Sequence, residues 1–561
     1  EPASMPERTV IQWSKDDIEA LGFFKIDVLS LGMLTALRKC FHAIRDYYGH
    51  LLELHSIPAD DGPTYRMIQR ADTVGTFQIE SRAQMSMLPR LLPHCFYDLV
   101  IEVAIIRPGP IQGKVIHPYL QRRHGLQAVT FPDERLKPIL ERTLGVTIFQ
   151  EQAMRIAIEV GDFTPGEAND LRRNIGAWNV REFTRDINPI LDKLKRGMER
   201  NGIEQAFIDQ LLGQMSGFSE YGFPESHAVS FALLAYASSY LKCHYPAPFY
   251  TALLNSQPMG FYSPHALLQS AQRDGIGVLP VCINHSDWDC TLERTNDNDE
   301  YAIRLGLRLV RGLSEIGART LIKTRYDIGR WQSFEHFIES CAIYRDDFTA
   351  LAAAKAFDRF GIERAEAIWR AEAVPYRVAV EVEESSVHWK KESAMQVIQR
   401  DFQAFNTSLG DHPVQVILKE QWQYPVSSDR LTKAEQLEYL ADGRDVFVFG
   451  MVLVKQSPGS AKGMVFLTLE DETGFINLVF TPDVYERFYQ LVERQSFLCV
   501  VGRVQKANNY HSILVKRVFE QQAISSVVEI RQPMSRETDK VSSNRKVGGE
   551  VGELVKPRIY R

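Results

Sequence analysis

Along most of this chain, apolar residues recur every three to four positions, which is the period of amphipathic helices. The pattern runs through residues 46–260 and is interrupted where Gly and Pro stand together, as at 107–110. Residues 261–300 are rich in loop formers with short strand candidates, and residues 301–373 return to helices with tight Gly turns. We therefore predict a mainly helical protein.

Two regions have a different pattern. Residues 22–29 form an apolar run that predicts a strand, followed by a helix through Ala36 and Arg38. After about residue 528 the chain is polar, so we expect a disordered tail. Between residues 445 and 520, five β-rich runs alternate with turns and predict a small barrel, namely Val446 to Val454, Met464 to Glu470, Phe475 to Phe480, Phe497 to Val504 and His511 to Val518.

Composition restricts the class of protein. A chain of 561 residues is too long for one hydrophobic core, so we expect several domains. No run approaches the roughly 18 apolar residues of a membrane span, which predicts a soluble protein with no membrane partner. The seven cysteines are scattered and odd in number, which argues against a secreted disulfide framework and favours the cytoplasm. Because residue 1 is Glu and not Met, we expect a fragment.

The net charge of −6 does not favour a polyanionic ligand. A global sum hides local clusters, however, and basic side chains gather at 122–123, at 193–196 and around Arg311. Charge alone therefore leaves the partner undecided.

Lys25 and Asp27 are the first candidates for chemistry. At positions i and i+2 of a strand, both side chains project from one face. A carboxylate on an apolar strand costs several kcal/mol to desolvate unless it is paired or binds a metal. A buried Lys–Asp ion pair is the plain alternative, and these two residues by themselves do not exclude it.

Three short runs surround Asp27: WSKDD at 13–17, KID at 25–27 and LGML at 31–34. Together they resemble the end of the palm in bacterial C-family DNA polymerases. The first and last runs resemble the error-prone, damage-tolerance branch more than the replicative alpha subunit of DNA polymerase III, although Ser14 stands where the branch usually has an acidic residue. The resemblance covers the chain to about residue 525 and implies the C-terminal half of such an enzyme.

Further blocks follow in the order found in the fingers domain of that family. They are TFQIESR at 76–82, IRPGP at 106–110, FQEQ at 149–152, DLRR at 170–173 and YGFPESHA at 221–228. Several ordered matches on one chain leave little room for coincidence.

The resemblance implies a DNA-directed DNA polymerase, a nucleotidyltransferase that acts in translesion synthesis and damage-induced mutagenesis. Asp27 is then one of three metal-binding carboxylates, with Lys25 beside it, and the cofactor is Mg²⁺ in a two-metal site. One aspartate cannot hold two ions, and in the family the other two carboxylates lie upstream. We therefore expect this fragment to lack two of the three.

A triphosphate needs cations that spread charge away from the transferring phosphoryl group. The adjacent arginines of the DLRR block are the best candidates, and an exposed charged helix face is the alternative. For the SH pair of the YGFPESHA block, the alternative is a helix cap with a satisfied histidine. With the family resemblance added, the predicted nucleotide-binding residues are Arg172, Arg173, Arg107, Gln78, Ser226 and His227.

Two DNA contacts are expected in the second half of the chain. The run VRGLS has the spacing of a helix-hairpin-helix, in which backbone N–H groups after a Gly turn contact a DNA phosphate, and an ordinary helical turn is the alternative. A weaker copy at 352–368 has Lys355 where Gly is usual. The barrel resembles an OB-fold, which stacks bases on aromatic rings in a basic groove. The predicted DNA-binding residues are Arg311, Gly312, Leu313, Ser314, Phe466 and Lys462.

The predicted fold class is a multidomain, mainly α protein with a partial α+β palm element at the N-terminus and a C-terminal β-barrel. The predicted domains are the end of the palm (1–45), the fingers (46–260), a little-finger and helix-hairpin-helix region (261–373), a connector (374–440), the OB-fold (441–525) and a disordered tail (526–561). Expected partners are primer–template DNA and deoxynucleoside triphosphates, with accessory translesion proteins and a sliding clamp. The competing hypothesis is a DNA-binding or scaffold protein without catalysis.

Two weaker signals are set aside. Cys282, His285 and Cys290 suggest zinc, but no fourth ligand stands at finger spacing, so core cysteines are the better interpretation. The run QRDF at 399–402 faintly resembles a sliding-clamp peptide, and matches this loose are common by chance.

Overall fold

The computed structural model describes most of the chain in ten segments. These are residues 30–106, 113–131, 133–176, 187–217, 223–295, 300–373, 391–457, 463–507, 510–520 and 558–560, with the single positions 13, 18 and 389 and residues 21–23. The predicted strand at 22–29 falls almost entirely outside them, so the palm element of the predicted fold class is not described. Among the described helices, none combines the length and the apolar character that crossing a bilayer requires.

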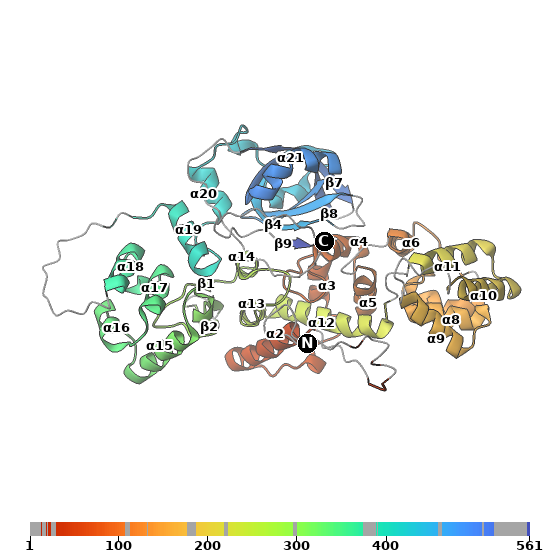
Figure 1. Cartoon of the computed structure of the whole chain (residues 1–561), viewed down its shortest axis with the longest axis horizontal. Helices are drawn as coiled ribbons and strands as arrows, with labels where there is room; N and C mark the ends of the chain where they lie inside the picture. Colours follow the sequence, from red (N-terminus) through yellow and green to blue (C-terminus); the bar gives the residue numbers. More distant parts are fainter. Residues whose placement is uncertain are drawn as a thin grey trace.

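A central body of helices surrounds α12, which crosses the middle of Figure 1. Its buried face is built from small residues, including Ala228, Ala232 and Ala235, and these allow α5 and α12 to approach closely. The helices of this body are α2 (Leu31–Ala43), α3 (Gly62–Gln69), α4 (Arg82–Leu91), α5 (Phe96–Ile105), α6 (Gly113–Arg123), α12 (Glu225–His244), α13 (Pro246–Leu254) and α14 (Pro264–Arg273).

A second group of helices has its own hydrophobic core to one side of this body (Figure 1). The helices are α7 (Lys137–Leu140), α8 (Gln150–Gly161), α9 (Pro165–Gly176), α10 (Ile187–Arg200) and α11 (Gln205–Gly217). Gly197 makes the close approach of α10 to α8 possible, because a Cβ there would stand 2.1 Å from the carbonyl oxygen of Gly161.

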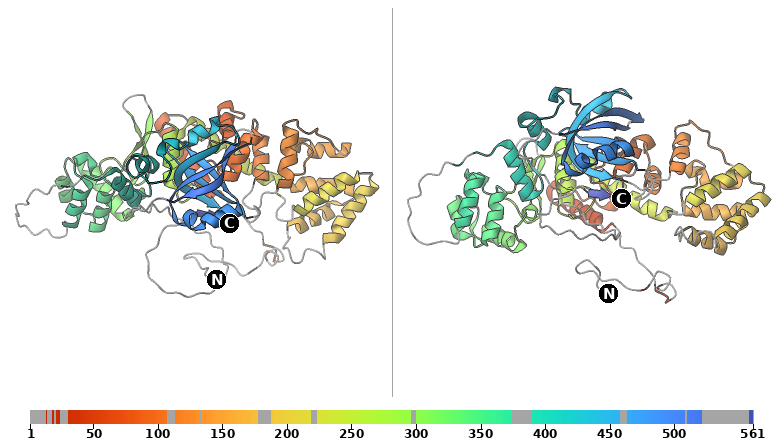
Figure 2. Two further views of the ribbon diagram at one scale, coloured as in Figure 1. Left: turned by 90° about the horizontal axis from the view of Figure 1, so that it is seen from above. Right: turned by 45° about the horizontal axis from the view of Figure 1, so that its top comes forward.

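The opposite side holds a small sheet and a further helical group, and Figure 2 shows the same separation in two other views. Strands β1 (Val278–Leu279), β2 (Thr291–Arg294) and β3 (Tyr301–Arg304) are ordered β1-β3-β2, with β3 parallel to β1 and antiparallel to β2. The helices are α15 (Glu315–Ile328), α16 (Phe334–Ser340), α17 (Arg345–Ala353) and α18 (Arg364–Ala373). Their core is aromatic and includes Trp331, Phe334, Phe337, Phe348 and Phe357.

Residues 391–440 form a layer against the barrel. Helices α19 (Ala394–Phe405) and α20 (Pro413–Glu420) share a core with the strands through Phe402, Val414 and Phe449. The part of the predicted connector that is described is thus packed structure. Phe402 of the QRDF run is buried in α19, so this run is not exposed as an extended clamp peptide.

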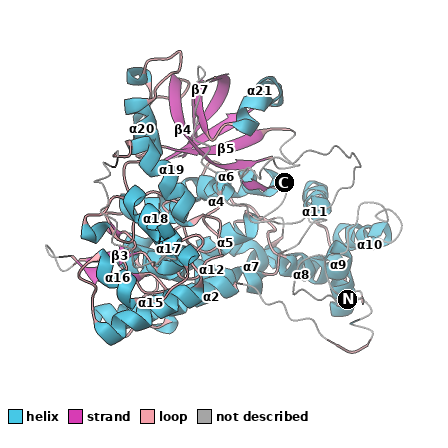
Figure 3. Ribbon diagram, turned by 60° about the vertical axis from the view of Figure 1, so that its left-hand side comes forward, coloured by secondary structure: helices cyan, strands magenta, loops and turns pink. Residues whose placement is uncertain are grey.

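The C-terminal strands close into the predicted barrel, whose strands are the magenta group at the top of Figure 3. Its strands are β4 (Asp445–Gln456), β5 (Val465–Glu470), β6 (Phe475–Phe480), β7 (Phe497–Ala507) and β8 (Tyr510–Phe519). Helix α21 (Pro482–Arg494) connects β6 to β7. The order is β5-β6-β8-β7-β4, and the additional pairing of β5 with β4 closes the sheet. Five strands with ends within three residues of the predicted runs, together with the helical regions, confirm these parts of the predicted fold class.

One short strand differs from expectation. β9 (Arg558–Tyr560) pairs in parallel with β4, with Val454 opposite Arg558, although the polar C-terminal segment predicts disorder. Backbone hydrogen bonds at a free strand edge do not depend on side-chain type, so a polar segment can pair there. The expectation is corrected for these three residues only.

Candidate nucleic-acid interface

Four of the predicted site residues, Lys25, Asp27, Arg107 and Lys462, lie outside the described residues. Arg173 belongs to the described backbone of α9, but its side chain lies outside the described part. The remaining candidates have defined surroundings.

Gln78 stands in a tight loop before α4. Its φ of 56° is left-handed, and its side chain is half-buried next to the fully buried Ile79. The Glu80 carboxylate holds the loop by accepting from the amides of Gly75 and Phe261, both at 3.0 Å. The loop that carries Gln78 is therefore held in place by Glu80, a residue of the same TFQIESR block.

Ser226 and His227 are exposed on the first turn of α12. The preceding residue ties this turn to two other helices, because the Glu225 amide donates to Glu151 at 3.0 Å and the Tyr97 hydroxyl donates to Glu225 at 2.7 Å. Burial, reinforced by Glu225, raises the pKa of Tyr97, which keeps this hydroxyl a donor. The FQEQ and YGFPESHA blocks are thus neighbours in space.

An aromatic cluster joins this turn to the Gln78 loop. The ring of Phe231 lies 5.4 Å from that of Phe77 and 6.5 Å from that of His227. The Phe77 amide also donates to Ser238 of α12 at 3.0 Å. The structure therefore brings the segments of Gln78 and of Ser226 and His227 together on one side of α12.

Arg172 lies elsewhere, on α9 of the side group of helices. Its Nε and Nη2 atoms donate to the Asn169 side chain, one turn earlier, at 3.1 and 3.0 Å. This is a local contact on one helix, and no described contact joins Arg172 to the α12 turn. A basic hollow of about 720 Å³ lies on α10 of the same group, lined by Lys193, Arg196, Glu199 and Arg200.

The VRGLS run forms a turn before α15. Gly312 has φ 84°, which only glycine adopts without strain, and Leu313 is buried beneath the turn. Ser314 caps α15 by accepting from the Gly317 amide at 2.9 Å. Arg311 is exposed and donates to the Asn406 side chain at 3.0 Å.

The helix that leads into the weaker second copy, α17, supports the first copy. Asp347 of α17 is buried and accepts from the amide of Ser314 at 2.6 Å and from its hydroxyl at 3.0 Å. Lys355 has φ 55°, so the position where Gly is usual does adopt the left-handed turn. The two hairpins therefore share one hydrogen-bonded support.

Phe466 lies on the barrel face that meets the central body. The guanidinium of Arg82 is 5.2 Å from the centroid of its ring. On the neighbouring strand, Phe475 is covered by Arg273 at 4.7 Å and stacks against Tyr262. Both aromatic side chains are thus covered by the helical half of the chain.

The expected Mg²⁺ site requires several oxygen ligands close together, since this ion prefers oxygen ligands. Among the described residues, two groups of His, Cys and acidic side chains have donor atoms close enough to one another to hold a metal ion, namely His94–Cys95–Asp98 and His265–His412–Glu470. Each contains a single carboxylate, so neither fits a pair of Mg²⁺ ions. The expected Mg²⁺ site includes Asp27, which lies outside the described residues.

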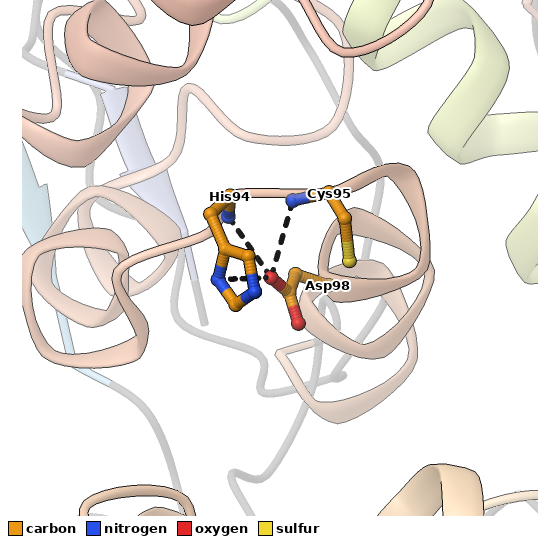
Figure 4. Close-up of side chains that lie close together, drawn as sticks. All are labelled: His94, Cys95 and Asp98. Atoms are coloured by element: carbon orange, nitrogen blue, oxygen red, sulfur yellow. Dashed lines mark hydrogen bonds and ion pairs between the residues drawn. The ribbon is translucent and has the colours of Figure 1, made fainter.

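The first of these groups is a helix cap (Figure 4). Asp98 accepts from the amides of His94 and Cys95 at 2.9 and 3.3 Å, and Arg123 grips both of its oxygens. Burial raises the pKa of Asp98, but Arg123 and the His94 amide outweigh burial and hold it below its usual range. Its oxygens are engaged, so this group offers no free carboxylate to an ion.

Several residues that shape the interface were not predicted. Glu80, Arg82 and Glu225 belong to the quoted motif blocks, and their place in those blocks was the signal that could have singled them out. Asp347 and Arg273 stand in no block, and their contacts join positions far apart in sequence.

Comparison with protein families gives three matches in chain order. Residues 33–202 match the bacterial DNA polymerase III alpha subunit finger domain, residues 275–367 a helix-hairpin-helix motif, and residues 446–520 an OB-fold nucleic acid binding domain. The nucleotide-site and domain-boundary predictions are tested by none of these matches and stay predictions.

Curated relatives are similar over nearly the whole chain. Error-prone DNA polymerase 2 of Agrobacterium fabrum is 43% identical over 93% of this chain and 48% of its own length. The error-prone DNA polymerases of Alkalilimnicola ehrlichii and Pseudomonas fluorescens are 49% and 44% identical, over 85% and 95% of this chain and 46% and 52% of their own lengths. The chain therefore spans about half the length of the curated relatives it matches.

Among solved structures, asparaginyl-tRNA synthetase from Pyrococcus horikoshii is 23% identical over 17% of this chain and 23% of its own, with a TM-score of 0.15. A TM-score this low does not indicate a shared fold.

Proposed function

Because the chain belongs to the bacterial error-prone DNA polymerase family, we propose that it is the part of such an enzyme that holds the incoming nucleotide and the DNA. The observation that carries the proposal is the order of the finger, helix-hairpin-helix and OB-fold matches on a chain 43% identical to such a polymerase over 535 residues. The reaction is template-directed nucleotidyl transfer, and its role is translesion synthesis and damage-induced mutagenesis in the cytoplasm.

The nucleotide is held by positive charge and by a shaped pocket. Arg172, Arg173 and Arg107 spread the charge of the triphosphate. Gln78, Ser226 and His227 line the pocket, a role supported by the aromatic cluster that joins their segments. The N-terminal end of α12 adds a partial positive charge that favours an anion there.

The metal is Mg²⁺, and Asp27 is its ligand in this chain, with Lys25 beside it. Asp27 and other palm carboxylates would hold Mg²⁺, which would supply positive charge at the primer hydroxyl and at the leaving pyrophosphate. Two ions need several carboxylates, so we infer that this chain binds DNA but does not extend a primer by itself.

The DNA is held without reading sequence. The turn of Arg311, Gly312, Leu313 and Ser314 contacts a backbone phosphate. The barrel binds the single-stranded template through Phe466 and Lys462. Accessory translesion proteins and a sliding clamp are the protein partners of such an enzyme.

The test is DNA binding and primer extension by the same purified chain. We expect it to bind a fluorescent primer–template in an anisotropy titration, with weaker binding by Arg311→Ala. We expect no extension with Mg²⁺ and the four deoxynucleoside triphosphates. Extension that Asp27→Ala abolishes would show a complete catalytic site in this chain and contradict the second inference. Failure to bind DNA would contradict the first.

A DNA-binding or scaffold protein without catalysis remains the second candidate. It is favoured by the single recognised metal carboxylate, Asp27. Adding the other half of a relative polymerase to the extension assay separates the two. Extension restored in the mixture, and lost again with Asp27→Ala, supports the polymerase, whereas DNA binding with no restored extension supports the scaffold.

A further inference from the structure

Three side chains from separate parts of the chain meet in the interior where the barrel rests on the helical half. His265 lies in α14, His412 caps α20, and Glu470 ends β5, and their exposed fractions are 0%, 6% and 0%. Glu470 Oε2 is 3.8 Å from His265 Nε2 and 4.0 Å from His412 Nε2. One donor atom from each residue lies within 4.8 Å of the other two. The three donor atoms therefore lie close together, with both Glu470–histidine distances longer than a hydrogen bond.

These three donor atoms have only the two long ion-pair contacts with one another. His265 Nε2, His412 Nε2 and Glu470 Oε2 are all buried without a hydrogen bond. Buried polar atoms are nearly always satisfied, so three unsatisfied atoms pointing at one place indicate a ligand there.

The protonation of His265 points the same way. Its Nδ1 lies 2.8 Å from the Thr407 hydroxyl, which itself donates to the Ser408 carbonyl. With the Thr407 hydroxyl donating to the Ser408 carbonyl, a long bond of 3.4 Å, Nδ1 donates to Thr407 and Nε2 presents a lone pair toward Glu470. A lone pair facing a carboxylate is repulsive unless something positive lies between them.

We propose that His265, His412 and Glu470 bind one zinc-class transition-metal ion, which fastens the OB-fold barrel to α14 and to the loop before α20. Two imidazoles and one carboxylate are a donor set that Zn²⁺ accepts, with water as the fourth ligand. Donor atoms around a tetrahedral ion with bonds of about 2.1 Å stand about 3.4 Å apart, so the two Glu470–histidine distances of 3.8 and 4.0 Å need to shorten by about half an ångström.

The outer contacts resemble those of protein metal sites. Thr407 orients His265, and Arg273 Nη1 donates to the other oxygen of Glu470 at 2.8 Å. Metal-ligating histidines and carboxylates are commonly held by such partners, which fix their orientation.

A single buried water is the competing occupant. Arg273 already offsets the charge of Glu470, which disfavours a divalent ion unless the fourth ligand is hydroxide. His412 Nδ1 accepts from the Val414 amide at 3.2 Å, and this long bond must break for Nδ1 to take up a proton when Nε2 binds metal. Arg273 Nη2 is also unpartnered, so two donors and two acceptors would match one water.

The test is the metal content of the purified chain after zinc loading and desalting. We expect one zinc per chain in the unchanged protein and none in His265→Gln. His94→Gln, from the other His/Cys/carboxylate group, is the matched control and keeps the zinc. Cobalt substitution gives a second readout, because Co²⁺ at a site of low coordination number shows visible absorption bands that His265→Gln should abolish.

Thermal unfolding then tests the fastening role. A chelator should lower the Tm of the unchanged protein by several degrees and leave that of His265→Gln unaffected, because ligands that bind only the folded state stabilise it. If His265→Gln does not fold by circular dichroism, His412→Gln takes its place. Zinc content in the unchanged protein no higher than in the folded variant would mean that water lies among these side chains and would overturn the proposal. Zinc lost in His94→Gln instead would overturn it as well.

Discussion

The guanidinium of Arg82 lies over the ring of Phe466, 5.2 Å from the ring centroid, and donates to the carbonyl oxygens of Leu467 and Leu478 at 2.7 and 2.9 Å. One arginine of the helical half thus holds two strands of the barrel and covers an aromatic side chain that we expect to stack on bases. Base stacking on Phe466 therefore requires this contact to open.

Replacing Arg82 should expose that ring. We expect Arg82→Met to bind an oligo-dT single strand more tightly by about 1 kcal/mol, since one stacked base contributes roughly 1–3 kcal/mol. Fluorescence anisotropy measures the affinity. Arg66→Met, an exposed residue of α3, is the control and should change nothing. If the double variant Arg82→Met/Phe466→Ala binds as tightly as Arg82→Met, Phe466 does not stack on the strand.

Gly317 is the point at which the two hairpins touch. A Cβ there would stand 2.2 Å from Asp347 Oδ2, the carboxylate that supports Ser314. We expect Gly317→Ala to lower the free energy of unfolding by about 1–3 kcal/mol, the usual cost of overpacking. Gly166→Ala in α9, where a Cβ meets nothing, is the control. Equal unfolding midpoints in urea for the two variants would contradict the shared support.

Arg311 offers a test of the phosphate contact. Each phosphate contact contributes to the salt dependence of DNA binding, so Arg311→Ala should reduce the slope of log affinity against log salt by about 1, equally for unrelated sequences. Arg319→Ala, on the following helix α15 and paired with Glu315, is the comparison variant and should leave the slope nearly unchanged. An unaltered slope for Arg311→Ala would place the phosphate elsewhere.

Glu102 gives a prediction on pH. It is fully buried in α5 with neither carboxylate oxygen hydrogen-bonded, and burial raises its pKa well above the ordinary value of 4.5, only slightly opposed by Arg90. A raised folded pKa means that stability is fully present below pH 4.5 and is lost as the pH rises, because only the unfolded chain ionises freely.

We therefore expect Glu102→Gln to match the unchanged protein near pH 4 and to exceed its stability at pH 7. The gain should be at least about 1.4 kcal/mol, the value of one pKa unit. Urea unfolding at the two pH values measures it. Glu159→Gln, an exposed glutamate of α8, should show no such difference. A gain that is equal at both pH values would point to packing and not to ionisation.

Local sequence patterns were sufficient to predict the barrel strands and one glycine turn. The alternating runs between residues 445 and 520 predict five strands, and the structure has five with ends within three residues of them, because a half-buried strand must alternate its side chains. The Gly turn at 312 was also predictable, since its left-handed φ of 84° favours glycine. By contrast, Lys355 also adopts a left-handed backbone conformation, but it is not glycine, so its residue type did not predict that conformation.

The candidate site was predictable only in part. Motif blocks singled out Gln78, Ser226 and His227, and the fold places their segments against one aromatic cluster. The same reasoning could not show that Arg172 lies on a separate helical group, bonded to Asn169. Nor could it show that Phe466 is covered, because the covering arginine is hundreds of positions away in the chain.

The sequence by itself therefore determined the helices, the barrel strands, the Gly turns and the family, since each depends on residues close together or on their order along the chain. The tertiary structure alone decided that Asp347 supports Ser314, that Arg82 covers Phe466, and that His265, His412 and Glu470 converge. The physical reason is that such contacts form only when separate elements pack together, and their spacing along the chain carries no periodic signal.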